Sequence, residues 1–263
     1  MKVDQVAKAL AEARRKATEL ASFPGEAPAD LAAAYAIQDR TVAASGRAVA
    51  GWKVAMIPPP LRDALGADRL AGPIFADSVQ EAGAEGSLQV PVYPGFAALE
   101  CEFVLRLARP LDPSGAPFTP DSLADAVASL HAGVEIASSV VAGNGDAGPC
   151  PTVADLGNNG GAIIGPAIPD WQDKAPAGLV SRMAVDGATV GEGSAEAVPG
   201  GPLAALAFLA NLLAGRGIGL KAGDIVLTGQ TNGVHRVKAG QSARAEFPGV
   251  MALDLTVTAK RPV

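Results

Sequence analysis

The most constraining stretch of the chain is the run of residues 99–107, where two glutamates lie in an otherwise largely apolar segment. From Cys101 to Leu107 the residues alternate as in a β-strand, on which side chains two positions apart share one face. Glu100 and Glu102 should therefore point the same way. Adjacent carboxylates repel each other unless a proton or a cation lies between them, and a hard divalent ion suits such a pair. Because exposed strands often carry two acids, this stretch alone does not establish a metal site.

A third acid strengthens the case for a metal. Glu135 lies in the segment His-Ala-Gly-Val-Glu-Ile-Ala, whose other residues are mostly small or apolar. A lone glutamate is hard to bury in such a setting without a partner. Glu135 therefore joins Glu100 and Glu102 as a candidate ligand.

Composition narrows the classes of partner. With 263 residues, 49% of them hydrophobic, the chain can bury a sizeable core as one large domain or two small ones. The formal net charge of -6 and the pI near 5.0 argue against a nucleic acid or an anionic membrane surface, because both need concentrated basic charge. Small metabolites and metals remain possible.

Targeting signals and cysteine usage narrow the class of protein further. The N-terminus lacks the cationic start, apolar run and cleavage site of a signal peptide, and no apolar stretch is expected to reach about 18 residues. We therefore expect a soluble, cytoplasmic protein. Cys101 and Cys150 are too few for a disulfide framework or a cysteine-based zinc site. With only His131 and His235 present, a histidine-rich metal site is excluded as well.

Hydrophobic periodicity predicts helices and strands along the whole chain. Val6, Leu10 and Ala13 recur at helical spacing. Arg14 and its basic neighbours lie largely off that stripe, on what we expect to be a solvated face. Asp30 is placed to cap a second helix. Further helices are expected to begin near residues 120 and 202, a hairpin to turn at residues 186–187, and strands to cover residues 48–57, 99–107, 162–165, 225–228, 243–247 and 253–257.

Four polar side chains outside the acidic strands are candidates for function. Lys53 is nearly enclosed by apolar residues. Either its ammonium group snorkels to water at an edge of the fold, or the residue takes part in the chemistry. Gln38 falls on the apolar side of the second helix, where bonding to a neighbouring loop is the structural alternative. Asp77 follows a turn, which a capping acid would also explain. Asp155 belongs to a polar, glycine-rich loop, and such loops often carry function, although a plain turn explains most of them.

The order of these motifs resembles the fumarylacetoacetate hydrolase superfamily, and within it the branch of 2-keto-4-pentenoate hydratases and 2-oxo-3-hexenedioate decarboxylases. In chain order the motifs are Ala-Tyr-Ala-Ile-Gln ending at Gln38, Gly-Trp-Lys-Val around Lys53, Leu-Glu-Cys-Glu ending at Glu102, Val-Glu-Ile around Glu135, Val-Ala-Asp ending at Asp155, and residues 220–230. No single motif is decisive, but together they cover most of the chain. The helical N-terminal segment resembles the hydratase branch rather than the short acylpyruvate hydrolases.

The resemblance implies an α+β fold, with a mixed β-roll core of the fumarylacetoacetase C-terminal-like type, flanking helices and a helical N-terminal segment. We expect a single domain over residues 1–263. Within it, residues 1–80 would form the helical segment and a lid, and residues 81–263 the β-roll core. A homo-oligomer is expected on the same ground.

The resemblance also implies roles for the candidate residues. The metal would be Mg²⁺ or Mn²⁺. Lys53 matches the family's active-site lysine, and Asp77 lies, with a looser match, where the family has an acid in the lid-forming segment. The expected catalytic residues are Lys53 and Asp77, the expected substrate contacts are Gln38, Asp155 and Asn158, and the expected metal ligands are Glu100, Glu102 and Glu135.

Two departures from the family pattern bear on the substrate. Ser138 and Val140 stand where the family usually has Asp and Arg. Without an arginine partner, a second substrate carboxylate would be costly to desolvate. We therefore expect a neutral substrate tail, as in a 2-hydroxy-pentadienoate, unless one of four other arginines reaches the pocket: Arg106, Arg182, Arg236 or Arg244.

The leading hypothesis is a metal-dependent hydratase that acts on a 2-hydroxy-dienoate, or its 2-oxo tautomer, in the degradation of aromatic compounds. A small 2-oxo acid can chelate a divalent ion through its carboxylate and keto oxygens, which stabilises a developing enolate. The same site would serve the decarboxylation of 2-oxo-3-hexenedioate or an acylpyruvate-type C–C hydrolysis. A non-catalytic small-molecule-binding protein is the alternative from another class.

Overall fold

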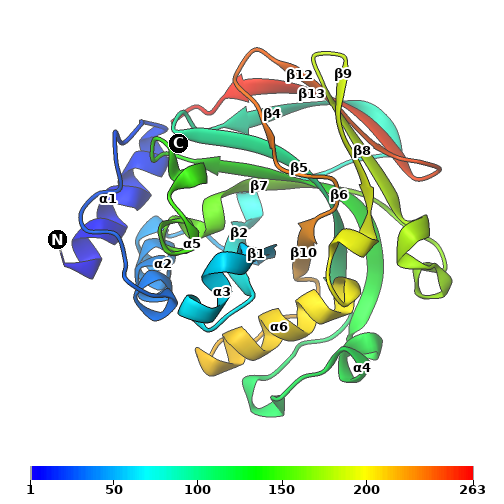
Figure 1. The fold of residues 1–263 in the computed structure, drawn as a ribbon, viewed down its shortest axis with the longest axis horizontal. Coiled ribbons are helices and arrows are strands. Elements are labelled where there is room, and N and C mark those ends of the chain that lie inside the picture. Colours follow the sequence, from blue (N-terminus) through cyan, green and yellow to red (C-terminus); the bar gives the residue numbers. More distant parts are fainter. Residues whose placement is uncertain (1, 263) are drawn as a thin grey trace.

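The computed structural model describes residues 2–262 and contains two β-sheets flanked by helices (Figure 1). The helices are α1 Val3–Lys16, α2 Leu31–Ser45, α3 Pro59–Leu65, α4 Pro120–Leu123, α5 Pro149–Ala154 and α6 Gly201–Gly215. The strands are β1 Val49–Met56, β2 Arg69–Phe75, β3 Val79–Glu81, β4 Glu85–Val92, β5 Phe96–Leu107, β6 Val127–Ser139, β7 Asn159–Ala167, β8 Val180–Val185, β9 Ala188–Ser194, β10 Ile225–Gln230, β11 His235–Arg236, β12 Ser242–Phe247 and β13 Met251–Ala259.

The larger sheet has eight strands in the order β2-β1-β10-β5-β6-β7-β3, with β11 paired to β5 beside this path. The smaller sheet has five strands in the order β4-β13-β12-β8-β9. In the larger sheet β1 and β10 are parallel, whereas β5 is antiparallel to both β6 and β10. The long strands β5 and β6 curve across the molecule (Figure 1). The predicted α+β class, with a mixed β core and flanking helices, is confirmed.

The main apolar core draws on both sheets. Phe103 on β5 and Phe247 on β12 are fully buried, and their rings meet edge to face with centroids 5.5 Å apart. Cys101 and Leu105 belong to the same core cluster as Phe103. Because side chains alternate along a strand, the glutamates between them must point to the opposite face of β5. The packing of the core therefore fixes the direction of the acidic pair.

The two N-terminal helices form a second apolar cluster with neighbouring loops. Val6, Leu10 and Ala13 of α1 are buried there, as their spacing predicts. Asp30 accepts a hydrogen bond from the Ala33 amide at 2.8 Å and so caps α2. The prediction that Arg14 lies on a solvated face is wrong, because this side chain is buried beside an acid from a distant loop.

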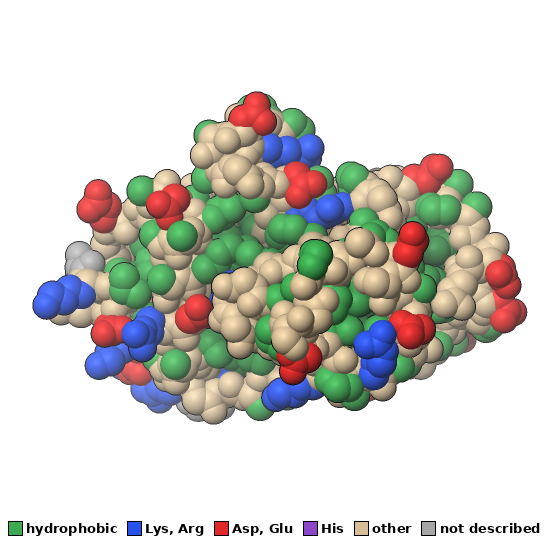
Figure 2. Space-filling view, turned by 90° about the horizontal axis from the view of Figure 1, so that it is seen from below, with side chains coloured by type: hydrophobic (Ala, Val, Ile, Leu, Met, Phe, Trp, Pro, Cys, Tyr) green, Lys and Arg blue, Asp and Glu red, His purple; other side chains and the backbone are tan. Residues whose placement is uncertain are grey.

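The segment Ala195–Gly215, which includes α6, is largely helical and apolar. At 21 residues it is long and apolar enough to cross a membrane by length and composition, so the expectation that no stretch reaches that size is corrected. Leu206, Leu209 and Leu213 of α6 are buried in the main core, which explains the apolar composition without a membrane. On the face shown in Figure 2, acidic, basic and hydrophobic side chains are interspersed.

The larger sheet crosses the predicted internal division at residue 80. Strands β1 and β2 precede that position, yet β1 pairs with β10 from the C-terminal part of the chain. Strand β3 spans the position itself and pairs with β7. The helical N-terminal segment therefore ends before β1, and the strands that follow belong to the same sheet as the acidic strands.

Candidate metal centre and active site

Three buried carboxylates converge at the middle of the larger sheet. Glu135 on β6 is the cross-strand partner of Glu100 on β5, and Glu102 lies two positions further along β5. One carboxylate oxygen from each lies within 4.8 Å of those of the other two. The three residues are 6%, 1% and 0% exposed, in the order Glu100, Glu102, Glu135. The structure thus brings together the three acids that the sequence singled out.

The electrostatics of this cluster favour a bound cation. Burial, followed by repulsion from Glu135, raises the pKa of Glu100 to about 8, although Lys53 opposes the shift. Burial and repulsion from Glu135 and Glu100 also raise the pKa of Glu102 well above its ordinary value. Three carboxylates at this spacing cannot all be ionised cheaply without positive charge among them.

Lys53 supplies one positive charge at the edge of the cluster. Its Nζ lies 3.2 Å from Glu135 Oε2, and the side chain is 5% exposed. Burial alone would lower the pKa of Lys53, but attraction by Glu135, Glu100 and Glu102 outweighs it and the pKa is raised above its ordinary value. Lys53 is therefore a buried ammonium rather than a snorkelling edge residue.

Specific donors hold two of the carboxylates, and Lys53 also pairs with one of these, Glu135. The Gly229 amide donates to Glu102 Oε2 at 2.8 Å, and Asn159 Nδ2 donates to Glu135 Oε1 at 3.1 Å. The other oxygen of Glu135, Oε2, is buried and lies 3.2 Å from the Lys53 ammonium. Hard divalent ions prefer such oxygen ligands, and outer donors of this kind orient metal ligands. The donor set fits Mg²⁺ or Mn²⁺.

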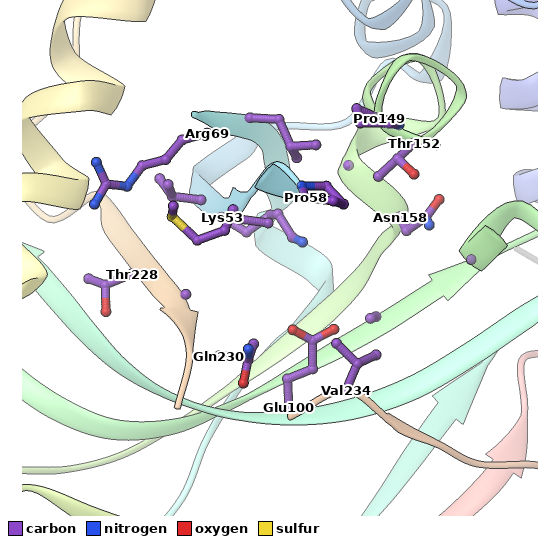
Figure 3. A pocket seen from close by; sticks show the side chains of 18 of the residues that line it. Lys53, Pro58, Arg69, Glu100, Pro149, Thr152, Asn158, Thr228, Gln230 and Val234 are labelled. Carbon is purple, nitrogen blue, oxygen red and sulfur yellow. The ribbon is translucent and has the colours of Figure 1, made fainter. Parts of the chain in front are cut away.

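A cavity of about 310 Å³ opens beside these groups. Lys53 and Glu100 face its interior, and Asn158 lies across from them (Figure 3). Asn158 Oδ1 accepts a hydrogen bond from Asn144 Nδ2 at 2.6 Å, which leaves its own amide group to donate. The remaining wall is largely apolar or neutral, with Phe96, Val198 and Val234 among the lining residues. The cavity can hold a small acid next to the carboxylates.

Asp155, a predicted substrate contact, is fully buried behind the cavity wall rather than in it. Its Oδ1 accepts a hydrogen bond from Arg14 Nε at 2.7 Å, and its Oδ2 accepts one from Ser139 Oγ at 2.5 Å. Arg14 also donates to the carbonyl oxygens of Asn159 and Ser138. Asp155 therefore anchors α1 to the loop that carries Asn158 and Asn159.

Gln38, also predicted to contact the substrate, is fully buried and does not line the cavity. Its Nε2 donates to the carbonyl oxygens of Ala71 and Val153, at 3.0 and 2.9 Å. Its side chain therefore holds α2 to β2 and α5. This agrees with the alternative interpretation of Gln38, in which it bonds to a neighbouring part of the chain rather than to substrate.

Asp77, the second predicted catalytic residue, does not line the cavity that Lys53 and Glu100 share. Its exposed carboxylate pairs with Arg47, whose Nε lies 3.0 Å from both oxygens. It lines a different cavity, together with Tyr93 and Lys260. The short helical turn after β2 carries Asp77 away from the carboxylates.

Two residues of the site were missed from the sequence. Arg14 stands among basic neighbours whose side chains are exposed, so nothing in the local pattern distinguishes it. Arg69 lines the cavity at the start of β2, and the four arginines named as possible replacements do not. Its neighbours Asp68 and Leu70 give no signal that the side chain turns inward.

Two glycines let the catalytic strands approach the Asn158 loop. A Cβ on Gly72, which pairs with Lys53 across β1 and β2, would lie 2.3 Å from the Leu156 carbonyl oxygen. Gly157 has a φ of +68°, and a Cβ there would lie 2.9 Å from Gly72 Cα and 3.3 Å from Lys53 Cδ. Any side chain at either position would push the loop from Lys53.

Comparison with known proteins agrees with this arrangement. The family described as fumarylacetoacetate (FAA) hydrolase C-terminal matches residues 69–258. A 2-keto-4-pentenoate hydratase from Burkholderia vietnamiensis is 28% identical over 261 residues, which is 97% of each chain. A TodF product hydratase from Pseudomonas putida is 30% identical over 228 residues, covering 84% of this chain and 82% of the relative.

A solved structure supports the fold along nearly the whole chain. The 4-oxalocrotonate decarboxylase from Pseudomonas putida G7, complexed with magnesium and adipate, has a TM-score of 0.80 at 22% identity and covers 97% of both chains. At that identity the likeness concerns the fold alone. The family match spans well over half of the chain and includes all three glutamates. The chain belongs to the fumarylacetoacetate hydrolase family.

Proposed function

We propose that this protein is a divalent-metal-dependent hydratase that adds water to a 2-hydroxy-dienoate or its 2-oxo-enoate tautomer. The observation that carries the proposal is the convergence of three buried glutamates and the ammonium of Lys53 beside a cavity that Lys53 and Glu100 line. The names of the relatives, hydratases at 28% and 30% identity, support the reaction class.

The roles of the carboxylates follow from their positions. Glu100, Glu102 and Glu135 would hold one Mg²⁺ or Mn²⁺ ion, which would supply an electrophile for the carboxylate and keto oxygens of a 2-oxo acid. Gly229 and Asn159 fix two of the carboxylates in place before any ligand arrives. This preorganisation limits the reorganisation needed during the reaction.

Lys53 would act on the substrate's 2-oxygen, which gains negative charge when the dienol loses its hydroxyl proton and again when water adds to the conjugated enone. Because its Nζ is held cationic by the carboxylates, it can donate a hydrogen bond or a proton there, and it cannot serve as a base while it is protonated. Asn158, with an amide group free to donate, would orient the substrate from the opposite wall.

The other predicted site residues would act at a distance. Asp155 and Gln38 are positioning residues, because each ties an element of the cavity wall to its neighbour through buried hydrogen bonds. A catalytic role for Asp77 has no support from its place in this chain, which is exposed and beside Arg47. Location in the cytoplasm and assembly into a homo-oligomer stay predictions from the sequence.

A panel of substrates separates the possible chemistries. Purified protein with Mg²⁺ would receive a 2-hydroxypenta-2,4-dienoate, a 2-oxohex-3-enedioate and an acylpyruvate, with absorbance, CO₂ release and product mass followed together. The proposal expects loss of the dienoate chromophore and a product heavier by one water. Release of CO₂ from the enedioate would indicate a decarboxylase, cleavage of the acylpyruvate a hydrolase, and no turnover a binding protein. Each of these results without hydration would contradict the proposal.

A further inference from the structure

The cavity wall holds one cationic side chain besides Lys53. Arg69 begins β2 and lines the cavity, and among the lining residues within 2–262 these two are the only Lys or Arg. In Figure 3 Arg69 lies on the side of Lys53 away from Asn158, near Thr228. The ends of the cavity therefore differ in charge.

The guanidinium of Arg69 is buried and only partly satisfied. The residue is 8% exposed, and its Nη2 donates to the Pro199 carbonyl oxygen. Its buried Nε has no hydrogen-bond partner among residues 2–262. A buried charged donor without a partner is costly, so a ligand that accepts from it would gain binding energy.

The nearest acid does not neutralise Arg69 effectively. Asp68 Oδ2 lies 3.6 Å from Nη1, and the Asp68 side chain is 53% exposed. An exposed contact of that length contributes little to binding because water screens it. The arginine therefore remains able to bind an anion from the cavity.

Strand pairing places Arg69 away from the carboxylates, toward the other end of the cavity (Figure 3). Across β1 and β2, Lys53 pairs with Gly72 and Met56 pairs with Arg69, so the two cations begin three residues apart along the strands. That spacing is about 10 Å along the strands, and in Figure 3 the Arg69 side chain extends away from Lys53, toward the far end of the cavity. An extended six-carbon acid held at one end beside Glu100 would bring its other end toward Arg69.

We propose that Arg69 binds the distal carboxylate of the substrate, so that this enzyme prefers a dicarboxylic 2-oxo acid to its monocarboxylic counterpart. The proposal rests on the proposed metal-dependent function and sets its substrate class. It reverses the expectation of a neutral tail, which followed from Val140 and Ser138. Neither residue lines the cavity: Val140 packs in the core with α1, and Ser138 bonds to the backbone of Tyr93 and Phe96.

The test measures binding of two saturated acids to the Mg²⁺-loaded protein. The probes are 2-oxoadipate and 2-oxohexanoate, which differ only in the distal carboxylate and have no C=C bond to hydrate. By calorimetry the wild type should bind 2-oxoadipate at least about tenfold more tightly. Arg69→Met should abolish that preference and leave the affinity for 2-oxohexanoate unchanged. Arg69→Lys should keep part of the preference, because lysine retains the positive charge but cannot donate two parallel hydrogen bonds to a carboxylate.

Two controls keep the result interpretable. Asp68→Asn leaves Arg69 in place and should retain the preference, and the thermal unfolding of each variant reports whether it is folded. Equal binding of the two acids by the wild type, or a preference that survives Arg69→Met, would overturn the assignment of Arg69. Hydration of the dienoate without any preference would leave the proposed function standing. An Arg69-dependent preference without hydration would instead refute the function and support this site.

Discussion

At the scale of single residues, burying three carboxylates together costs free energy, and a bound cation offsets that cost. Glu100, Glu102 and Glu135 are buried side by side, and the ammonium of Lys53 lies 3.2 Å from Glu135 Oε2. Removing a charge from the cluster should therefore change metal binding before it changes the fold.

Glu102→Gln keeps the size of the side chain and its hydrogen bond from Gly229 while it removes a negative charge from the site. We expect the affinity for Mg²⁺ to fall by at least about tenfold, since loss of even an outer partner of a metal ligand commonly costs that much. Calorimetry measures it, with Glu85→Gln, an exposed acid on β4, as the matched control. Equal affinities in Glu102→Gln and the wild type would show that the ion binds elsewhere.

Lys53→Met keeps much of the length and apolar volume of the lysine and deletes its charge. Turnover should drop by about 10²–10⁴-fold, the usual contribution of a positioned proton donor. Because Lys53 is not a metal ligand, Mg²⁺ affinity should not fall, and this readout separates a catalytic role from a structural one. Lys238→Met, at an exposed position, is the control. A folded Lys53→Met variant with an unchanged rate would return Lys53 to a structural role.

The binding of Mg²⁺ should depend on pH through Glu100. Burial and repulsion from Glu135 raise the pKa of Glu100 to about 8 in the metal-free protein, so below that pH a proton occupies the ligand. The metal must displace this proton, so its affinity should rise as the pH approaches and passes about 8. Calorimetric titrations across this range would check the trend, and a flat profile would argue against a protonated ligand.

The acidic ligands were predictable from sequence for a local reason. The period of two along a strand fixes the face of Glu100 and Glu102, and burial of an isolated acid at Glu135 requires a partner. Gln38, Asp77 and Asp155 are different, because a polar residue in a helix or loop does not reveal which distant group it meets. The sequence motif located Asp155 but could not show that its carboxylate forms a salt bridge with Arg14.

At the scale of elements, α1 takes part in building the active site although it lies outside the cavity. Arg14 joins α1 to the loop between α5 and β7 through Asp155 and the Asn159 carbonyl. Asn159 in turn donates to Glu135. One helix is thus linked to a metal ligand through a short chain of buried hydrogen bonds.

Arg14→Met should unfold more easily because it leaves the carboxylate of Asp155 buried without its cation. Such a loss is worth about 3–5 kcal/mol in the free energy of unfolding. Arg15→Met is the matched control: its side chain is 56% exposed and pairs with Glu12 on the same helix, so water screens the pair and little change in the free energy of unfolding is expected. Urea unfolding of both variants measures the difference. Similar free energies for the two would show that the Arg14 network contributes nothing.

The elements themselves were predicted better than their contacts. The caps and turns of the sequence placed α2, α6 and the β8–β9 hairpin, where Asp186 and Gly187 adopt the positive φ angles of a tight turn. The amphipathic stripe of α1 was correct as well. The side-chain partners of Arg14 and Arg69 depend on long-range pairing, and no local pattern specifies it.

At the scale of the whole molecule, the family fold gathers residues from distant parts of the chain at one cavity. Lys53 comes from β1, the glutamates come from β5 and β6, and Asn158 comes from the loop before β7. The order of motifs along the sequence was enough to predict this fold. It could not place Arg69 against the cavity, because that position depends on how β2 pairs with β1.

If one ion bound by the three glutamates supports hydration, adding Mg²⁺ to metal-free protein should restore activity and stabilise the fold together. The experiment titrates metal-free protein with Mg²⁺ and records the rate of dienoate hydration and the melting temperature on the same samples. A ligand that binds only the folded state raises its stability as it saturates. We expect no hydration in EDTA and, as Mg²⁺ is added, a joint rise of the rate and the melting temperature with one midpoint. Full hydration in EDTA, or a rising rate with no change in melting temperature, would contradict it.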